Sequence, residues 1–202
     1  MPAQLTNIPH AGMLTSLMFL TRYPTSDTNV NRGRSRVVYD LFLDLDILAL
    51  DGTRPDGTAV DISSQAPTMD NEDCVVCHSL LDPVASSFQN WNRRGFYRPN
   101  QPWYDDMFQA GFAGVDRPDY ESTSSLQWLS SELIKDPSFN DAMVRIVYNG
   151  LTGQEPLRPP GDEATEAESD AYLAESSHLA KITELFVADN QNLKTLVKEI
   201  VL

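Results

Sequence analysis

Hydrophobic residues along this chain recur mostly at helical spacing. Within residues 10–23, Met13, Leu17 and Leu20 fall on one stripe, and Pro24 ends the pattern. Further helices are expected over residues 34–50, 83–91, 126–134, 138–149, 168–189 and 192–202. No segment gives a clear strand pattern of alternating hydrophobic and polar residues. The sequence therefore predicts a mostly α fold.

Three segments lack this periodicity and are predicted to be loops. Residues 51–67 contain two Asp-Gly-type breaks, and residues 154–169 are rich in proline and then acidic. Residues 92–120 are rich in Gly, Pro and aromatic residues, and a loop of that length usually packs around a ligand or has a function. Asp82-Pro83 has the composition of a helix start, with Asp82 as the N-cap and Pro83 at the first helical position. We therefore expect a new helix to begin at Pro83.

The chain is strongly acidic. Its 202 residues include 29 Asp and Glu against 15 Lys and Arg, which gives a net charge of -14. Nucleic acid is not an expected partner, because phosphate contacts need clustered basic residues. The acidity favours either docking on a basic partner surface or simple solubility. The most apolar early run, residues 12–20, is too short to span a bilayer and lacks the basic leader of a signal peptide, so no transmembrane segment is expected.

The chain has two cysteines, Cys74 and Cys77, which lie three residues apart, and His78 follows directly. Cys-x-x-Cys-His is the attachment signature of c-type haem. Two thiols one helical turn apart can reach the two vinyl groups of a porphyrin, and the next imidazole can bind the iron. The motif therefore predicts one covalently attached haem c with His78 as the proximal ligand.

Three other interpretations of the cysteine pair stay open. A thioredoxin-like redox pair normally follows an apolar strand, whereas residues 67–73 are largely polar. A zinc site needs four ligands, and His10 and His178 are the remaining histidines, without paired spacing. A disulfide across two intervening residues would constrain little chain. Haem attachment is the favoured interpretation.

Three stretches of the chain resemble the C-terminal part of the planctomycete-type cytochrome proteins, large bacterial proteins with several uncharacterised cytochrome-associated domains. These stretches are residues 10–20 with 31–34, residues 74–98, and residues 139–155 with 193–202. The second is the specific one, because Cys-x-x-Cys-His is followed there by Asp-Pro, Asn-Trp and Gly-Phe-Tyr-Arg. It departs from the family pattern at Val84-Ala85, where Gly-Phe is usual, and at Gln89, where Glu is usual. The resemblance implies an exported haem protein with an electron-transfer or redox function, and it gives no substrate.

The second axial ligand of the iron is expected from the long loop after the motif. Met107 lies in this loop, and small cytochromes with this motif commonly bring a Met across the haem from such a loop. Core packing is the alternative role for Met107. The other candidates are Met13, Met18, Met69, Met143, His10 and His178. Of these, Met13, Met18 and Met143 are expected in the core and the histidines at the surface. A Met ligand would give a six-coordinate electron carrier, whereas an open position would permit catalysis.

Arginines and aromatic residues near the motif are candidates for the haem pocket. Two clusters, Arg32, Arg34 and Arg36 and then Arg93, Arg94 and Arg98, are candidate partners of the propionates, with surface salt bridges as the alternative. Arg98 beside Tyr97 is the preferred choice. Trp91, Phe96 and Trp103 are expected to cover the porphyrin and exclude water, a role compatible with ordinary core packing.

Together these features predict a single c-type cytochrome domain over residues 1–202, a cytochrome c-like helical domain with additional flanking helices and long haem-covering loops. It would comprise an N-terminal helix pair (10–50), a haem-binding core (68–120) and C-terminal helices (121–202). The expected function is that of a monohaem cytochrome outside the cytoplasm, which transfers single electrons to or from a redox partner protein. The alternatives are a haem enzyme, peroxidase-like or oxidising, with an open distal site, and a haem-stabilised structural subunit of a larger complex.

Overall fold

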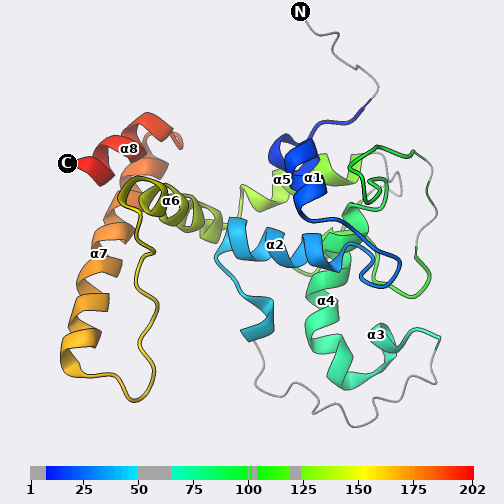
Figure 1. The fold of residues 1–202 in the computed structure, drawn as a ribbon, viewed down its shortest axis with the longest axis horizontal. Helices are drawn as coiled ribbons and strands as arrows, with labels where there is room; N and C mark the ends of the chain where they lie inside the picture. Colours follow the sequence, from blue (N-terminus) through cyan, green and yellow to red (C-terminus); the bar gives the residue numbers. More distant parts are fainter. Residues whose placement is uncertain (1–7, 50–64, 100, 102–103, 119–123) are drawn as a thin grey trace, which may run out of the picture. The chain divides into compact units, whose positions relative to one another are not determined.

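A computed structural model describes residues 8–49, 65–99, 101, 104–118 and 124–202 of the chain (Figure 1). The described residues are mostly helical, as predicted, with one short two-stranded hairpin. The chain divides into two compact units: unit 1 comprises Met1–Asp40 and Leu45–Leu133, and unit 2 comprises Leu41–Asp44 and Ile134–Leu202. The single domain over residues 1–202 stays a prediction. No helix in the described ranges is both long enough and apolar enough to cross a membrane.

Unit 1 contains the residues of the haem motif. Its elements are η1 (Gly12–Thr15), α1 (Leu17–Arg22), α2 (Arg32–Leu43, whose last turn belongs to unit 2), η2 (Ile47–Ala49), α3 (Pro67–Asp70), α4 (Glu72–Ser87), β1 (Gly111–Phe112), β2 (Val115–Asp116) and α5 (Ser125–Leu133). Helix α2 lies against α4, where the Tyr39 hydroxyl donates to the Leu80 carbonyl at 3.2 Å (Figure 1). Residues from four of the helices form the fully buried core, among them Leu20, Val38, Val84 and Leu129. The predicted loop over 51–67 lies outside the described residues up to Ser64.

The first predicted helix, over residues 10–23, is interrupted at Ser16. Ser16 is extended (ψ 140°) and caps α1, because its side chain accepts a hydrogen bond from the Phe19 N–H. The interruption changes which residues face the core, so Phe19 and Leu20 are buried while Met13 and Met18 are 59% and 84% exposed. The expectation that Met13 and Met18 lie in the core is therefore wrong.

Helix α4 is continuous through the Asp82-Pro83 pair. The helix start predicted at Pro83 is wrong, because α4 begins at Glu72, where Asn71 is its N-cap. Acidic residues in the first turn, Glu72 and Asp73, favour that start through the helix dipole. Asp82 is fully buried inside the helix and its carboxylate binds side chains instead of capping the backbone.

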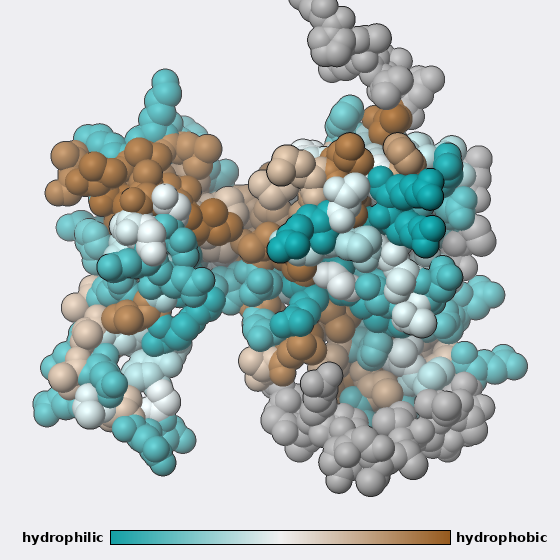
Figure 2. Space-filling view, viewed as in Figure 1, coloured by the Kyte–Doolittle hydropathy of each residue, from teal (hydrophilic) through white to brown (hydrophobic). Residues whose placement is uncertain are grey.

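Unit 2 contains three helices, α6 (Pro137–Thr152), α7 (Glu166–Ala188) and α8 (Leu193–Val201), which pack on one another. Their shared core consists of Val144, Leu179, Ile182, Phe186 and Leu196. Helix α6 ends at its C-cap Gly153, which is left-handed (φ 71°), and so extends beyond the predicted end at residue 149, because Gly150 lies within the helix. Figure 2 shows hydrophobic residues gathered on the surface over α8, where Val201 is 68% exposed.

One buried arginine joins three segments of unit 1. Arg34 of α2 is fully buried, and burial lowers its pKa to about 10, against a smaller opposing effect of Tyr104. Its guanidinium donates five hydrogen bonds. Four go to the carbonyl oxygens of Trp91 (2.7 Å), Tyr23 (2.8 Å), Asn92 (2.9 Å) and Leu20 (3.0 Å), and the fifth goes to Oδ1 of Asn31 (3.0 Å). These bonds tie the end of α1 and the start of the 91–98 segment to α2. Arg34 therefore satisfies buried carbonyls that water cannot reach.

We expect Arg34→Met to lower the free energy of unfolding by about 3–5 kcal/mol, because the substitution leaves several buried carbonyls without a donor. Urea unfolding followed by circular dichroism measures the change. Arg36→Met on the same helix is the matched control, because Arg36 is half exposed and pairs with Asp46 only at 3.8 Å, so its loss should cost about 1 kcal/mol or less. Equal losses in the two variants would contradict the role of Arg34.

Candidate functional site

Helix α4 brings the residues of the haem motif to one face. The Asn71 side chain accepts hydrogen bonds from the N–H groups of Asp73 (2.9 Å) and Cys74 (3.3 Å), which fixes the first turn of the helix. Cys77 and His78 follow Cys74 at helical spacings of three and four residues, so the three side chains neighbour one another. Both cysteines are free thiols of intermediate exposure. They are therefore accessible for covalent attachment.

The imidazole of His78 is held by a buried carboxylate. Its Nδ1 lies 2.9 Å from Oδ1 of Asp82, one turn further along α4, and Asp82 is completely buried. Arg32 of α2 binds the same carboxylate in a bidentate manner, with Nε to Oδ1 at 2.7 Å and Nη2 to Oδ2 at 3.0 Å. The three side chains form one network, which we call the His78–Asp82–Arg32 triad.

Charge and hydrogen bonding keep Asp82 ionised in spite of its burial. Burial alone would raise the pKa of this carboxyl, but the hydrogen bonds from His78 and Arg32 and the positive charge of Arg32 together bring its pKa below the usual value. An ionised carboxylate only accepts hydrogen bonds, so Nδ1 of His78 carries the proton. In the neutral imidazole this leaves Nε2 as the nitrogen whose lone pair can bind a metal.

The donor set of α4 fits a covalently attached haem. Two accessible thiols can bind the porphyrin edge, and an imidazole whose second nitrogen already donates to a carboxylate is the usual form of a metal-binding histidine. The His78 side chain is 23% exposed, so its ring is not enclosed by the protein. Cys74, Cys77 and His78 thus have the chemistry that the sequence motif requires.

Met107, the predicted distal ligand, is buried with 3% exposure. The two neighbouring residues attach its segment to the helices around the motif. The Asp106 carbonyl accepts from the Thr68 hydroxyl of α3 at 2.8 Å, and the Phe108 carbonyl accepts from the Ser86 hydroxyl of α4 at 2.7 Å. The segment therefore lies against both α3 and α4. Iron ligation by Met107 stays a prediction.

The remaining ligand candidates lie in different settings. Met69 is half-buried on α3, which directly precedes the haem helix. Met143 is also half-buried but belongs to the core of unit 2. His10 and His178 are exposed, as expected for surface histidines. Met69 is thus the alternative whose helix lies nearest the motif in the chain.

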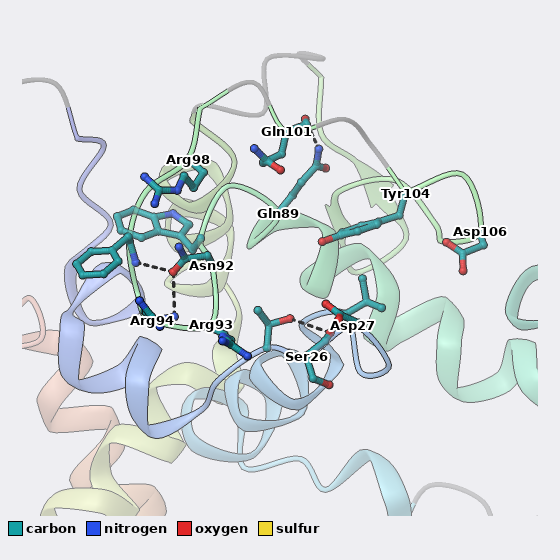
Figure 3. Close-up of a pocket in the computed structure, with 14 residues that line it drawn as sticks. Ser26, Asp27, Gln89, Asn92, Arg93, Arg94, Arg98, Gln101, Tyr104 and Asp106 are labelled. Carbon is teal, nitrogen blue, oxygen red and sulfur yellow. Dashed lines mark hydrogen bonds between the residues drawn. The ribbon is translucent and has the colours of Figure 1, made fainter.

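The predicted haem-pocket residues Trp91, Phe96, Tyr97 and Arg98 meet in one segment. Trp91 and Tyr97 form a β-bridge and their rings lie 5.3 Å apart. Trp91, Phe96 and Arg98 line a hollow of about 830 Å³ (Figure 3), whose described lining contains neither cysteine of the motif nor His78. The structure thus brings these residues together around a hollow that the motif residues do not line, and their role as haem cover stays a prediction. Trp103 lies outside the described residues.

Asp82 is the site residue that the sequence interpretation missed. It was expected to cap a helix, because Asp-Pro is a common helix start. The available signal was the spacing of four residues from His78, which places two side chains on one helical face if the helix continues. Its partner Arg32 was a candidate partner of a propionate, with a salt bridge as the alternative, and the structure places it in a salt bridge with Asp82.

Comparison with protein-family models, with curated proteins and with solved structures finds no match to this chain. The site is therefore characterised by its own geometry.

We expect Asp82→Asn to lower the free energy of unfolding of the chain by about 3–5 kcal/mol at neutral pH, because it leaves the Arg32 charge without its buried partner. The pKa of Asp82 is lowered in the folded chain, so its stabilisation is fully present above the unfolded value of about 4 and is lost as the pH falls through the folded value. The difference between wild type and variant should therefore shrink in acid. Urea unfolding at several pH values measures both effects.

Asp46→Asn is the control for this prediction. Asp46 also pairs with an arginine of α2, but its side chain is 50% exposed and the pair is 3.8 Å apart. Its loss should cost about 1 kcal/mol or less. A cost for Asp82→Asn no larger than this, or one that does not change with pH, would show that the triad adds little stability.

Proposed function

We propose that this chain is a monohaem c-type cytochrome that transfers single electrons to or from a redox partner. The observation that carries the proposal is the arrangement on α4, where two free thiols accompany an imidazole whose Nδ1 is fixed by Asp82 and whose Nε2 is free. Sequence and geometry agree here, because the motif predicts a proximal histidine and the triad prepares that histidine for a metal.

Each residue of the site has a separate task in this proposal. Cys74 and Cys77 hold the haem through thioether bonds, and Nε2 of His78 binds the iron. Asp82 and Arg32 hold the imidazole ring in one orientation and one tautomer. The haem supplies the one-electron chemistry, and the protein sets its reduction potential through the axial ligands and the surrounding hydrogen bonds.

The resemblance to the planctomycete-type cytochrome proteins supports the same function and an exported location. Covalent haem attachment normally takes place outside the cytoplasm, which agrees with that location. The net charge of -14 favours a redox partner with a basic docking surface, through long-range attraction. We propose such a protein partner, and a place in a larger complex is compatible with it.

Haem staining of the denatured chain tests the proposal directly. After expression in a bacterial periplasm with the cytochrome c maturation apparatus, we expect the wild-type band to stain, because the haem remains attached covalently. Cys74→Ser combined with Cys77→Ser should abolish the stain, since both attachment points are gone. Ser79→Ala is the matched control, because Ser79 is an exposed residue of the same helix outside the motif, and it should stain like wild type. An unstained wild-type band would refute haem attachment.

We expect Met107→Ala to change the absorption spectrum of the oxidised chain from low-spin to high-spin, because the iron would lose its sixth ligand. The far-red band of Met-to-iron ligation should disappear with it. Met143→Ala is the matched control, since it removes a half-buried Met of unit 2. A high-spin spectrum in the wild-type chain would contradict Met107 as ligand.

A haem enzyme with an open distal site is the second candidate, and the triad is the observation that favours it. A hydrogen bond to a buried carboxylate makes the proximal imidazole a stronger electron donor. Electron donation from the proximal side is one of the levers by which a protein favours activation of a distal ligand over simple electron transfer. The spin state of the wild-type iron separates the two candidates.

A further inference from the structure

The hollow lined by the 91–98 segment has the charge pattern of a binding site for small anions. Three arginines line it, Arg93, Arg94 and Arg98, and Figure 3 places them on one side of the hollow, with Asp27, Tyr104 and Asp106 on the other. The cavity volume of about 830 Å³ is within the range of small-molecule sites. The described lining includes no residue of the haem motif, so the inference does not rest on haem attachment.

The guanidinium groups of these three arginines lack partners within the part of the chain that the structure describes. Six other described arginines have ion pairs or hydrogen bonds through their side chains, namely Arg32, Arg34, Arg36, Arg117, Arg145 and Arg158. Arg22 is the other described arginine whose guanidinium has no described partner, and it does not line the hollow. The chain has 29 acidic residues, yet none of the described ones pairs with the three exposed guanidinium groups of the hollow, so their charge is available to an anion. A bound anion would neutralise that charge.

The segment that carries the arginines is held rigidly. Oδ1 of Asn92 accepts from the N–H groups of Arg94 (2.9 Å) and Phe96 (3.0 Å), and the Arg98 N–H donates to the Asn90 carbonyl at 2.7 Å. Buried Arg34 binds the carbonyl of Asn92 at 2.9 Å. A segment fixed in this way presents its charged side chains with little loss of backbone entropy on binding.

The opposite side of the hollow carries Asp27 and Tyr104, two side chains that can form hydrogen bonds with hydroxyl groups. Burial and the negative charges of Asp106 and Asp27 raise the pKa of Tyr104, against the effect of Arg34, so its hydroxyl stays protonated and can donate. The carboxylate of Asp27 can accept hydrogen bonds from a hydroxyl of the ligand. Trp91 and Phe96 add apolar surface against which a carbon skeleton can pack.

We propose that this hollow binds a small hydroxylated organic anion with two or more negative charges. The anionic groups lie against the three arginines and the hydroxyl groups face Asp27 and Tyr104. Such charges come either from carboxylates, as in a hydroxylated polycarboxylate, or from a phosphate ester, as in a sugar phosphate. Guanidinium groups bind both in a bidentate manner.

Titration calorimetry of the full chain at low ionic strength tests the site, with citrate and glucose 6-phosphate as the two anionic probes and glycerol as the neutral one. We expect at least one anion to bind, and glycerol not to bind. Arg93→Gln, Arg94→Gln and Arg98→Gln should each weaken that binding about tenfold, since a charge-assisted hydrogen bond is lost. Binding of citrate alone would identify the polycarboxylate class, and binding of glucose 6-phosphate alone the phosphate class.

Arg22→Gln is the matched control, because Arg22 is exposed, lies on α1 and does not line the hollow. The affinity of this variant for the anion should stay within about twofold of wild type, because Arg22 does not line the hollow and gives the anion no charge-assisted hydrogen bond. The proposal is overturned if neither anion binds, or if Arg22→Gln weakens binding as much as the three hollow variants do. Circular dichroism confirms that all four exposed substitutions leave the fold intact.

Discussion

The buried carboxylate of Asp82 is the constraint around which unit 1 is organised. It is completely hidden from solvent and receives two hydrogen bonds from Arg32 of α2 and one from His78 of its own helix. A buried charge is tolerated only when its partners satisfy it, so the relative placement of α2 and α4 is fixed wherever Asp82 is ionised. The candidate haem ligand is thus positioned by a contact with a helix about fifty residues away in the sequence.

Helix α2 joins the two candidate sites of unit 1 through two arginines separated by one residue. Arg32 reaches Asp82 on the helix of the haem motif, while Arg34 binds the carbonyls of Trp91 and Asn92 at the base of the arginine-lined hollow. Both use the planar donor geometry that lysine lacks. The first turn of α2 therefore supports the imidazole of His78 in one direction and the 91–98 segment in the other.

Local sequence signals predicted much of the secondary structure, whereas features that depend on tertiary contacts were not predicted. The helical class and the helices α5 and α6 follow from the periodicity of hydrophobic residues along the sequence. The continuity of α4 through Pro83 was missed, because Asp82 is buried against Arg32 of the distant helix α2. The break at Ser16 was also missed, although its signal is local, since the Ser16 side chain caps α1. The motif residues Cys74, Cys77 and His78 were predicted from spacing alone, and their role in haem binding stays a prediction. Asp82 was not, since its role depends on Arg32, and no local pattern indicates that pairing.

Stability alone does not account for the triad. A buried ion pair replaced by well-packed apolar residues of similar volume is often as stable or more so, so the fold of α2 on α4 has no need of charged groups at these positions. The histidine does need them, because a carboxylate on Nδ1 fixes the tautomer, orients the ring and raises the basicity of Nε2. A more basic proximal ligand stabilises the oxidised iron and so lowers the reduction potential. Under the proposed function, the cost of burying Asp82 against Arg32 would be a requirement of the metal ligand, which a haem-binding α4 would impose on the helix packed against it.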